Sequence, residues 1–186
     1  FPHYGVKMTE EKKVQINPTF HLKKQAAHPQ ESSPEYLEYR RKWEENPQKR
    51  IVGRVPIHMD LESTSVCNLK CITCFQTFDP PESGFMKMEL FRKIIDEGAQ
   101  KGLCSLKLNF RGEPLINPNI PKMVKYAKEK GIIEVMFNSN CTMLTEQIAN
   151  ALIDAGLDKI NCSVDACIPA LYEKIRVGAK FDVVLN

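Results

Sequence analysis

Three cysteines on one short segment are the residues of this chain best suited to chemistry. Cys67, Cys71 and Cys74 follow a C-x3-C-x2-C spacing just after a strand-like run. Cysteine sulfur ligates iron–sulfur clusters, so three thiolates on a tight loop could hold three irons of a four-iron cluster. No fourth cysteine is nearby, which would leave one iron open to bind something other than protein. With 7 cysteines in 186 residues, chance would produce this spacing about 0.01 times per chain.

A structural zinc site, with His58 as a fourth ligand, is the alternative. Zinc sites built on short C-x2-C units normally add a second, distant pair of ligands, and that pair is missing here. Ligand count therefore favours iron. The remaining cysteines are expected to be structural. Two lie in strand-like runs as small hydrophobes, and two lie at strand ends as inert or substrate-facing thiols: Cys104 and Cys162, then Cys141 and Cys167.

Composition is typical of a soluble globular protein that binds neither membranes nor nucleic acid. The chain is 42% hydrophobic and 26% charged, and its net charge is only +3. No apolar run approaches the ~18 residues of a membrane span, and the first residues do not resemble a signal peptide. An odd number of cysteines is poor support for a disulfide framework and indicates a reducing cytoplasm.

An N-terminal arm and an amphipathic helix are expected over residues 1–54. Residues 1–33 are polar and interrupted by prolines, without a sustained apolar period. A helix is predicted from residue 34 to about 46, in which Tyr36, Tyr39 and Trp43 share one stripe. Such stripes usually pack on a core, so we expect this one to dock on the rest of the protein rather than bind a ligand.

Strand-like and helix-like runs alternate after Gly53, which predicts a parallel α/β fold. Each predicted helix ends at a glycine, the residue suited to the left-handed position just past a helix. The helices carry apolar faces at helical spacing, for example Ile120, Met123, Val124 and Ala127, or Ile148, Ala149, Leu152 and Ile153. The strands are expected near 55–62, 104–110, 132–138 and 159–165, and the helices near 86–101, 118–130 and 145–155, with Gly102, Gly131 and Gly156 after them.

The predicted strands alternate apolar and polar residues, so one face should pack under helices while the other is hydrophilic. A parallel sheet buried on both faces would read as continuous hydrophobics instead. A barrel or half-barrel with a polar lumen fits this pattern, and so does an open two-layer sheet with a wet face. The apolar positions are Val55, Ile57, Met59 and Leu61, then Cys104, Leu106, Leu108 and Phe110; the polar ones include His58, Asp60, Lys107, Asn109, Glu134, Asn138 and Asn161.

Unusual polar clusters follow the carboxyl end of every predicted strand. The cysteine loop follows the first strand, and the runs Arg-Gly-Glu-Pro (111–114), Asn-Ser-Asn (138–140) and Ser-Val-Asp (163–165) follow the other three. Barrel enzymes and open α/β sheets both place their active sites at this edge. Four coincidences on one edge favour a functional site over scattered surface residues.

The cysteine loop, followed one βα unit later by Gly112-Glu113-Pro114, resembles the radical SAM superfamily. The resemblance covers roughly residues 55–186 and implies a partial TIM-like (βα)6 barrel, of which about four βα units are present. It looks most like members that carry a C-terminal SPASM-type domain, and we expect that domain to lie outside these 186 residues. The chain begins at Phe1 and ends at Asn186, so we expect a fragment that exposes an unpaired sheet edge.

The resemblance implies a 4Fe–4S cluster on Cys67, Cys71 and Cys74, and S-adenosylmethionine as the second cofactor. Gly112 would permit close backbone approach, and Glu113 would accept a charge-assisted hydrogen bond from the cofactor ammonium. Arg111 departs from the family pattern, because it stands where a first glycine is expected.

Weaker assignments from the same resemblance are Asn140 and Ser163, facing the ribose or the methionine end of the cofactor. Arg176 would pair with the cofactor carboxylate, or else be a solvated helix charge. The implied activity is formation of a 5′-deoxyadenosyl radical that abstracts hydrogen from a peptide or a sugar or cell-envelope precursor. Its partner would be a low-potential flavodoxin-type or ferredoxin-type electron donor. The alternative is a zinc-stabilised or clusterless binding module without catalysis.

Overall fold

Four parallel strands form the centre of the protein, which a computed structural model describes over residues 33–185. The predicted arm therefore lies outside the described residues, apart from Ser33. The strands stand in chain order across the sheet, β1-β2-β3-β4, and are joined by parallel pairing throughout. Their bounds are β1 His58–Asp60, β2 Ser105–Lys107, β3 Glu134–Ser139 and β4 Lys159–Cys162.

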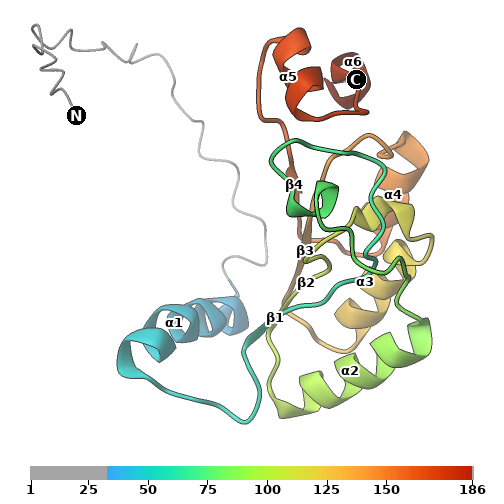
Figure 1. Ribbon diagram of the computed structural model, residues 1–186. Coiled ribbons are helices and arrows are strands. Elements are labelled where there is room, and N and C mark those ends of the chain that lie inside the picture. Colours follow the sequence, from blue (N-terminus) through green and yellow to red (C-terminus); the bar gives the residue numbers. More distant parts are fainter. Residues whose placement is uncertain (1–32, 186) are drawn as a thin grey trace, which may run out of the picture.

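The helices that connect the strands all cover the same face of this sheet (Figure 1). Strands in chain order under helices on one face are typical of (βα) barrels, whereas doubly wound sheets carry helices on both faces. The described strands and helices therefore have the arrangement of part of a (βα) barrel. The connecting helices are α2 Met88–Lys101, α3 Ile120–Glu129 and α4 Glu146–Asp154, with single 3-10 turns at η2 Phe75–Thr77 and η3 Pro114–Ile116.

The main hydrophobic core lies between the sheet and these helices, as the apolar spacing predicted. The strand residues Leu106, Leu108, Val135 and Phe137 have no exposed surface. All four apolar positions named for the predicted helix over 118–130 are buried residues of α3. Gly102, Gly131 and Gly156 adopt the expected positive φ angles just past the three helices. Sequence spacing along a strand and a helix was therefore enough to identify this core.

Two predicted core positions are wrong. Phe110 is 67% exposed because β2 ends at Lys107 and the chain has already left the sheet by residue 110. Ile153 is 71% exposed because α4 covers the last described strand, and no further element of residues 33–185 packs on its outer side. The first strand is also shorter than the predicted run over 55–62.

The second face of the sheet is polar, as the strand alternation predicted. His58 Nε2 contacts Asp60 Oδ1 at 3.0 Å, and Lys107 Nζ bridges from β2 to Asp60 Oδ2 at 3.0 Å. Further along the sheet, Asn161 Nδ2 donates to Asn138 Oδ1 at 2.9 Å. Hydrogen bonds across neighbouring strands thus line the face that a closed barrel would turn inward.

Helix α1, Pro34–Lys49, packs on this polar face beside the amino-terminal ends of the strands (Figure 1). Ser33 caps it, accepting a hydrogen bond from Tyr36 N at 3.1 Å. Tyr39 is 1% exposed, and its hydroxyl donates to Ser105 Oγ at 2.9 Å and lies 3.1 Å from Glu134 Oε2. The predicted docking of the aromatic stripe is confirmed at Tyr39.

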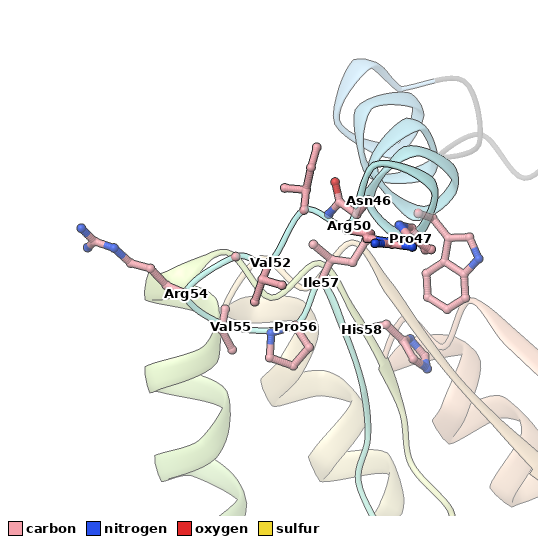
Figure 2. A pocket seen from close by; sticks show the side chains of 12 residues that line it. Asn46, Pro47, Arg50, Val52, Arg54, Val55, Pro56, Ile57 and His58 are labelled. Carbon is pink, nitrogen blue, oxygen red and sulfur yellow. The ribbon is translucent and has the colours of Figure 1, made fainter.

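Trp43, at the end of the stripe, meets the His58 ring edge-on with a centroid separation of 5.0 Å. It nevertheless remains 39% exposed, because it lies over a cleft of about 800 Å³ between the end of α1 and the chain entering β1 (Figure 2). This cleft is at the amino-terminal end of β1, whereas the cysteine loop follows the carboxyl end. It is therefore separate from the predicted site.

Two short helices, α5 Pro169–Ile175 and α6 Phe181–Leu185, follow the last strand. They form a second, smaller hydrophobic cluster beyond the carboxyl ends of the strands (Figure 1). In the described part of the chain, no helix combines the length and the apolar character needed to cross a bilayer.

Replacing Tyr39 with alanine tests whether α1 is held by this one buried ring. Tyr39→Ala should lower the free energy of unfolding by about 3–5 kcal/mol, since it removes a buried aromatic side chain and leaves a cavity. Leu37→Ala on the same helix is the control, because Leu37 is 57% exposed and should cost less than about 0.5 kcal/mol. Urea denaturation measures both. Equal losses would show that α1 does not depend on Tyr39.

Candidate metal centre and cofactor site

The cysteine loop is held against the end of α5 by its own backbone. Lys70 N donates to Val177 O at 2.9 Å, and Ile72 N donates to Ile175 O at 3.0 Å. Leu69 lies in the second hydrophobic cluster and is buried against α5 and α6. The position of the loop therefore depends on a segment a hundred residues later in the chain, which C-x3-C-x2-C spacing alone could not indicate.

All three cysteine side chains pack on the same small cluster. Cys71 is 6% exposed, and Cys67 and Cys74 are half-buried beside it. Burial raises the pKa of the Cys67 thiol, so a metal bound there would have to displace its proton.

The three cysteines suit a four-iron cluster better than a single metal ion. Within residues 33–185, no three His, Cys, Asp or Glu side chains are close enough together to hold a single metal ion. Each cysteine of a four-iron cluster binds a different iron, so the sulfurs surround a larger group instead of converging on one atom. Three thiols on one loop fit that arrangement. His58, the zinc ligand considered above, contacts Ser105 and Asp60 on the polar face of the sheet instead.

Arg176 lies just past the end of α5 and reaches the cysteine loop. Its Nη1 lies 3.7 Å from Cys71 Sγ, and its Nε donates to Asp165 Oδ2 at 2.6 Å. Its side chain is only 18% exposed. Arg176 is therefore not a solvated helix charge, and Asp165 holds its guanidinium beside a predicted iron ligand.

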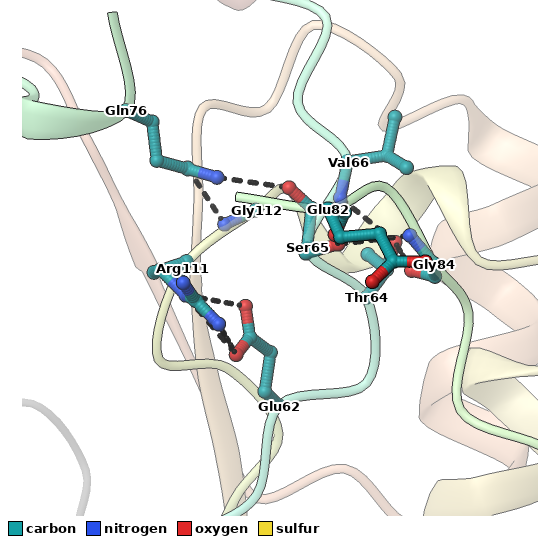
Figure 3. A network of polar contacts seen from close by, with 9 residues as sticks. All are labelled: Glu62, Thr64, Ser65, Val66, Gln76, Glu82, Gly84, Arg111 and Gly112. Atoms are coloured by element: carbon teal, nitrogen blue, oxygen red, sulfur yellow. Dashed lines mark hydrogen bonds and ion pairs between the residues drawn. The ribbon is translucent and has the colours of Figure 1, made fainter. Parts of the chain in front are cut away.

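Gly112 lies where the loop after β2 meets the segment that leads into the cysteine loop (Figure 3). Its φ is +65°, and a Cβ there would lie 2.2 Å from Thr64 O and 2.9 Å from Val66 O. Gly112 N donates to Gln76 Oε1 at 3.0 Å, and Glu113 N donates to Val66 O at 2.8 Å. The close backbone approach expected at Gly112 is therefore a contact with the backbone of Thr64 and Val66.

Arg111, which departs from the family pattern, forms an ion pair with Glu62 (Figure 3). Its Nε lies 3.0 Å from Glu62 Oε1, and its Nη2 lies 3.0 Å from Glu62 Oε2. The pair links the carboxyl ends of β1 and β2. Glu62 was not among the predicted site residues, and its position directly before the site segment is the signal that could have identified it.

Glu113 is buried, 2% exposed, and its carboxylate joins the ends of β2 and β3. Oε1 accepts hydrogen bonds from Ser139 Oγ at 2.7 Å and Leu115 N at 3.1 Å, and Oε2 accepts one from Asn140 N at 2.7 Å. Burial raises the pKa of Glu113 above its ordinary value, although these three donors oppose the shift. Ser139 was not among the predicted site residues.

Asn140 links this carboxylate to the cysteine loop. Its Nδ2 donates to Asn68 Oδ1 at 2.9 Å, and Asn68 Nδ2 donates in turn to Thr142 Oγ1 at 2.8 Å. Asn140 Oδ1 accepts from Thr142 Oγ1 at 2.7 Å. The structure thus brings Glu113, Asn140 and the loop of Cys67 and Cys71 into one network, with Asn68 and Thr142 as members that the sequence did not reveal.

Ser163, Cys141 and Cys162 lie at the edges of this network. Ser163 N donates to Ser139 O at 2.8 Å, which places Ser163 at the end of β4. Cys141 is buried, and its burial together with the adjacent Cys162 raises its pKa to about 12, so its thiol stays protonated at neutral pH. Cys162 is exposed, contrary to prediction, because β4 is the edge strand of the described sheet. Cys104 is half-buried.

Substituting Gly112 tests the close contact at the centre of the site. Gly112→Ala should reduce the free energy of unfolding by about 2–4 kcal/mol, since its methyl group would overlap backbone oxygens at a positive φ. Gly131→Ala is the matched control, because Gly131 also has a positive φ of 85° but no atom of the described residues lies within 4 Å of where its methyl group would be. The control should cost about 1 kcal/mol. Equal losses in urea denaturation would rule out the clash.

The ionisation of Glu113 can be isolated with Glu113→Gln. Because burial raises the folded-state pKa, the folded chain binds this proton more tightly than the unfolded chain does. The contribution of Glu113 to stability is complete below its ordinary pKa of 4.5 and is lost as the pH rises through the folded-state pKa. Acidification from pH 7 towards 4.5 should therefore favour the wild type relative to the variant in chemical denaturation. The opposite trend would mean that the three donors outweigh burial.

The sequence model of the Radical SAM superfamily matches residues 61–186. A probable GTP 3',8-cyclase of Methanococcus maripaludis is 34% identical over 133 residues, which are 71% of this chain and 44% of that protein. The tungsten-containing aldehyde ferredoxin oxidoreductase cofactor-modifying protein of Pyrococcus furiosus is 31% identical over 122 residues, 65% of this chain and 34% of that protein. The chain spans less than half the length of either relative.

Solved structures agree on the architecture. Streptococcus suis SuiB bound to precursor peptide SuiA matches 79% of this chain and 32% of its own, with a TM-score of 0.59 and 17% identity. BtrN in complex with AdoMet and 2-DOIA matches 66% of this chain and 56% of its own, with a TM-score of 0.53 and 21% identity. At such low sequence identities, this structural likeness shows the fold alone. Because the superfamily match extends over two thirds of the sequence, the chain belongs to the radical SAM superfamily.

Proposed function

We propose that residues 55–186 form the cluster-binding part of a radical SAM enzyme core, preceded by an arm and helix over residues 1–54. The observation that carries this proposal is the anchoring of three free cysteines on one loop at the carboxyl edge of the sheet. The cofactors of the family are a 4Fe–4S cluster and S-adenosylmethionine. When bound, they supply reductive cleavage of the sulfonium to methionine and a 5′-deoxyadenosyl radical, which abstracts a substrate hydrogen.

The residues of the chain hold and orient these groups. Cys67, Cys71 and Cys74 would each ligate one iron of the cluster, and the fourth iron would have no protein ligand. Arg176 supports Cys71 by donating towards its sulfur while Asp165 fixes the guanidinium. A role for Arg176 on the cofactor carboxylate is compatible with this position, because guanidinium carries several donors.

The rim residues position the cofactor side of the site. Gly112 lets the loop after β2 approach the cysteine segment closely. Glu113 holds the ends of β2 and β3 together. Its carboxylate accepts three hydrogen bonds within the protein and has a fourth lone-pair site that could accept one from the cofactor ammonium. Asn140 and Ser163 complete the edge where the ribose or the methionine end would lie.

Substrate and partners follow from likeness alone. Relatives named as GTP 3',8-cyclases match 71% of this chain, so GTP is the first substrate to test, ahead of peptides and sugar or cell-envelope precursors. A low-potential electron donor of flavodoxin or ferredoxin type would deliver the electron. Seven free cysteines suit a reducing compartment such as the cytoplasm.

Anaerobic reconstitution with iron and sulfide tests the proposal. The full chain should bind about four irons and four sulfides and, with dithionite, convert S-adenosylmethionine to 5′-deoxyadenosine. A variant with Cys67, Cys71 and Cys74 changed to alanine should lose both properties. Cys104→Ala is the control, because Cys104 lies at the opposite end of β2 from the cysteine loop and should keep the iron. A colourless protein with one tightly bound zinc would instead support the non-catalytic module.

A further inference from the structure

Tyr172 is the central residue of the small cluster behind the cysteine loop. It lies in α5, has no exposed surface, and meets the Phe181 ring edge-on with a centroid separation of 5.3 Å. Leu69, Cys71 and Ala179 complete the buried part of this cluster. The ring of Tyr172 is thus packed as a phenylalanine would be, in the same core as a predicted iron ligand.

The hydroxyl of Tyr172 is unsatisfied. Among the buried side-chain nitrogen and oxygen atoms of residues 33–185, Tyr172 Oη is the one without a hydrogen-bond partner. A buried donor left unpaired costs stability, and phenylalanine would fill the same space without that cost. A hydroxyl at this position therefore indicates an acceptor that is present only in another state of the protein.

The chemistry around Tyr172 indicates what the acceptor is. Cys71 belongs to the same cluster, and Arg176, four residues after Tyr172, already donates towards Cys71 Sγ at 3.7 Å. Cys67 and Cys74 are among the half-buried residues that pack against this hydrophobic cluster. The functional groups gathered here are sulfur atoms, and the sulfurs of an iron–sulfur cluster accept hydrogen bonds that adjust its potential.

We propose that Tyr172 donates its hydroxyl hydrogen bond to a sulfur of the cluster held by Cys67, Cys71 and Cys74. This inference rests on the proposed function. Tyr172 is then a positioning residue, and Tyr172 and Arg176 together supply two hydrogen-bond donors to the sulfurs of the iron–sulfur cluster. Because reduction adds negative charge to the cluster, donors stabilise the reduced form more than the oxidised form and raise the reduction potential.

The metal-free protein gives the first test. Tyr172→Phe removes an unsatisfied hydroxyl, so the apo variant should melt about 2–4 °C above the apo wild type. Tyr126→Phe is the matched control, because Tyr126 Oη donates to the Asp96 carboxylate at 2.9 Å and its removal should leave the melting temperature unchanged or lower. An apo Tyr172→Phe protein that melts at or below the wild type would overturn the proposal.

The loaded protein gives the second test. After reconstitution, both proteins should contain equal iron, and the cluster of Tyr172→Phe should have a more negative midpoint potential in a redox titration followed by electron paramagnetic resonance. Tyr126→Phe should match the wild type. Equal potentials in the presence of equal iron would refute the role of Tyr172 alone.

A redox titration without S-adenosylmethionine distinguishes a cluster sulfur from S-adenosylmethionine as the acceptor of the Tyr172 hydroxyl. The shift must be present before S-adenosylmethionine is added, and a shift that appears only with it would assign the hydroxyl to that cofactor and reject the sulfur contact. Wild type that binds no iron at all would instead refute the proposed function, and the inference with it.

Discussion

The buried carboxylate of Glu113 is the contact on which the site depends. One oxygen accepts from Ser139 and Leu115, and the other accepts from the backbone of Asn140. The backbone N–H of Glu113 donates to the carbonyl of Val66, at the start of the cysteine loop. Hydrogen bonds to a charged group are stronger than neutral ones, so the side chain of Glu113 fixes the ends of two strands and its backbone ties them to the cysteine loop.

The two faces of the sheet differ in character. Leu106 and Phe137 bury their side chains under the connecting helices, whereas Asp60 and Lys107 line the opposite face with an ion pair. The parallel strands all end at one edge, where the loops of the site meet. α1 covers the other end of the polar face through the buried ring of Tyr39, so structural packing and the site are kept apart.

The cysteine loop lies between two supports that differ in character. On the sheet side, Asn68 is hydrogen-bonded to Asn140 and Thr142, which are polar. On the other side, Leu69 and Cys71 enter the hydrophobic cluster of α5 and α6, from which Arg176 reaches back to Cys71. Apolar packing fixes the loop and limits water near the sulfurs, while the few polar contacts determine its orientation. Both features affect the potential of an iron–sulfur centre.

The sequence by itself determined the features that depend on neighbouring residues. The C-x3-C-x2-C spacing, the glycines after the helices and the strand alternation all act within one element, and they were sufficient for the α/β class and for the candidate ligands. Tertiary structure alone decided which groups meet. The bond of Glu113 to Ser139 and the pair of Arg111 with Glu62 join segments distant in the chain, because strand register brings them together. Helix packing likewise buries the hydroxyl of Tyr172 without a partner.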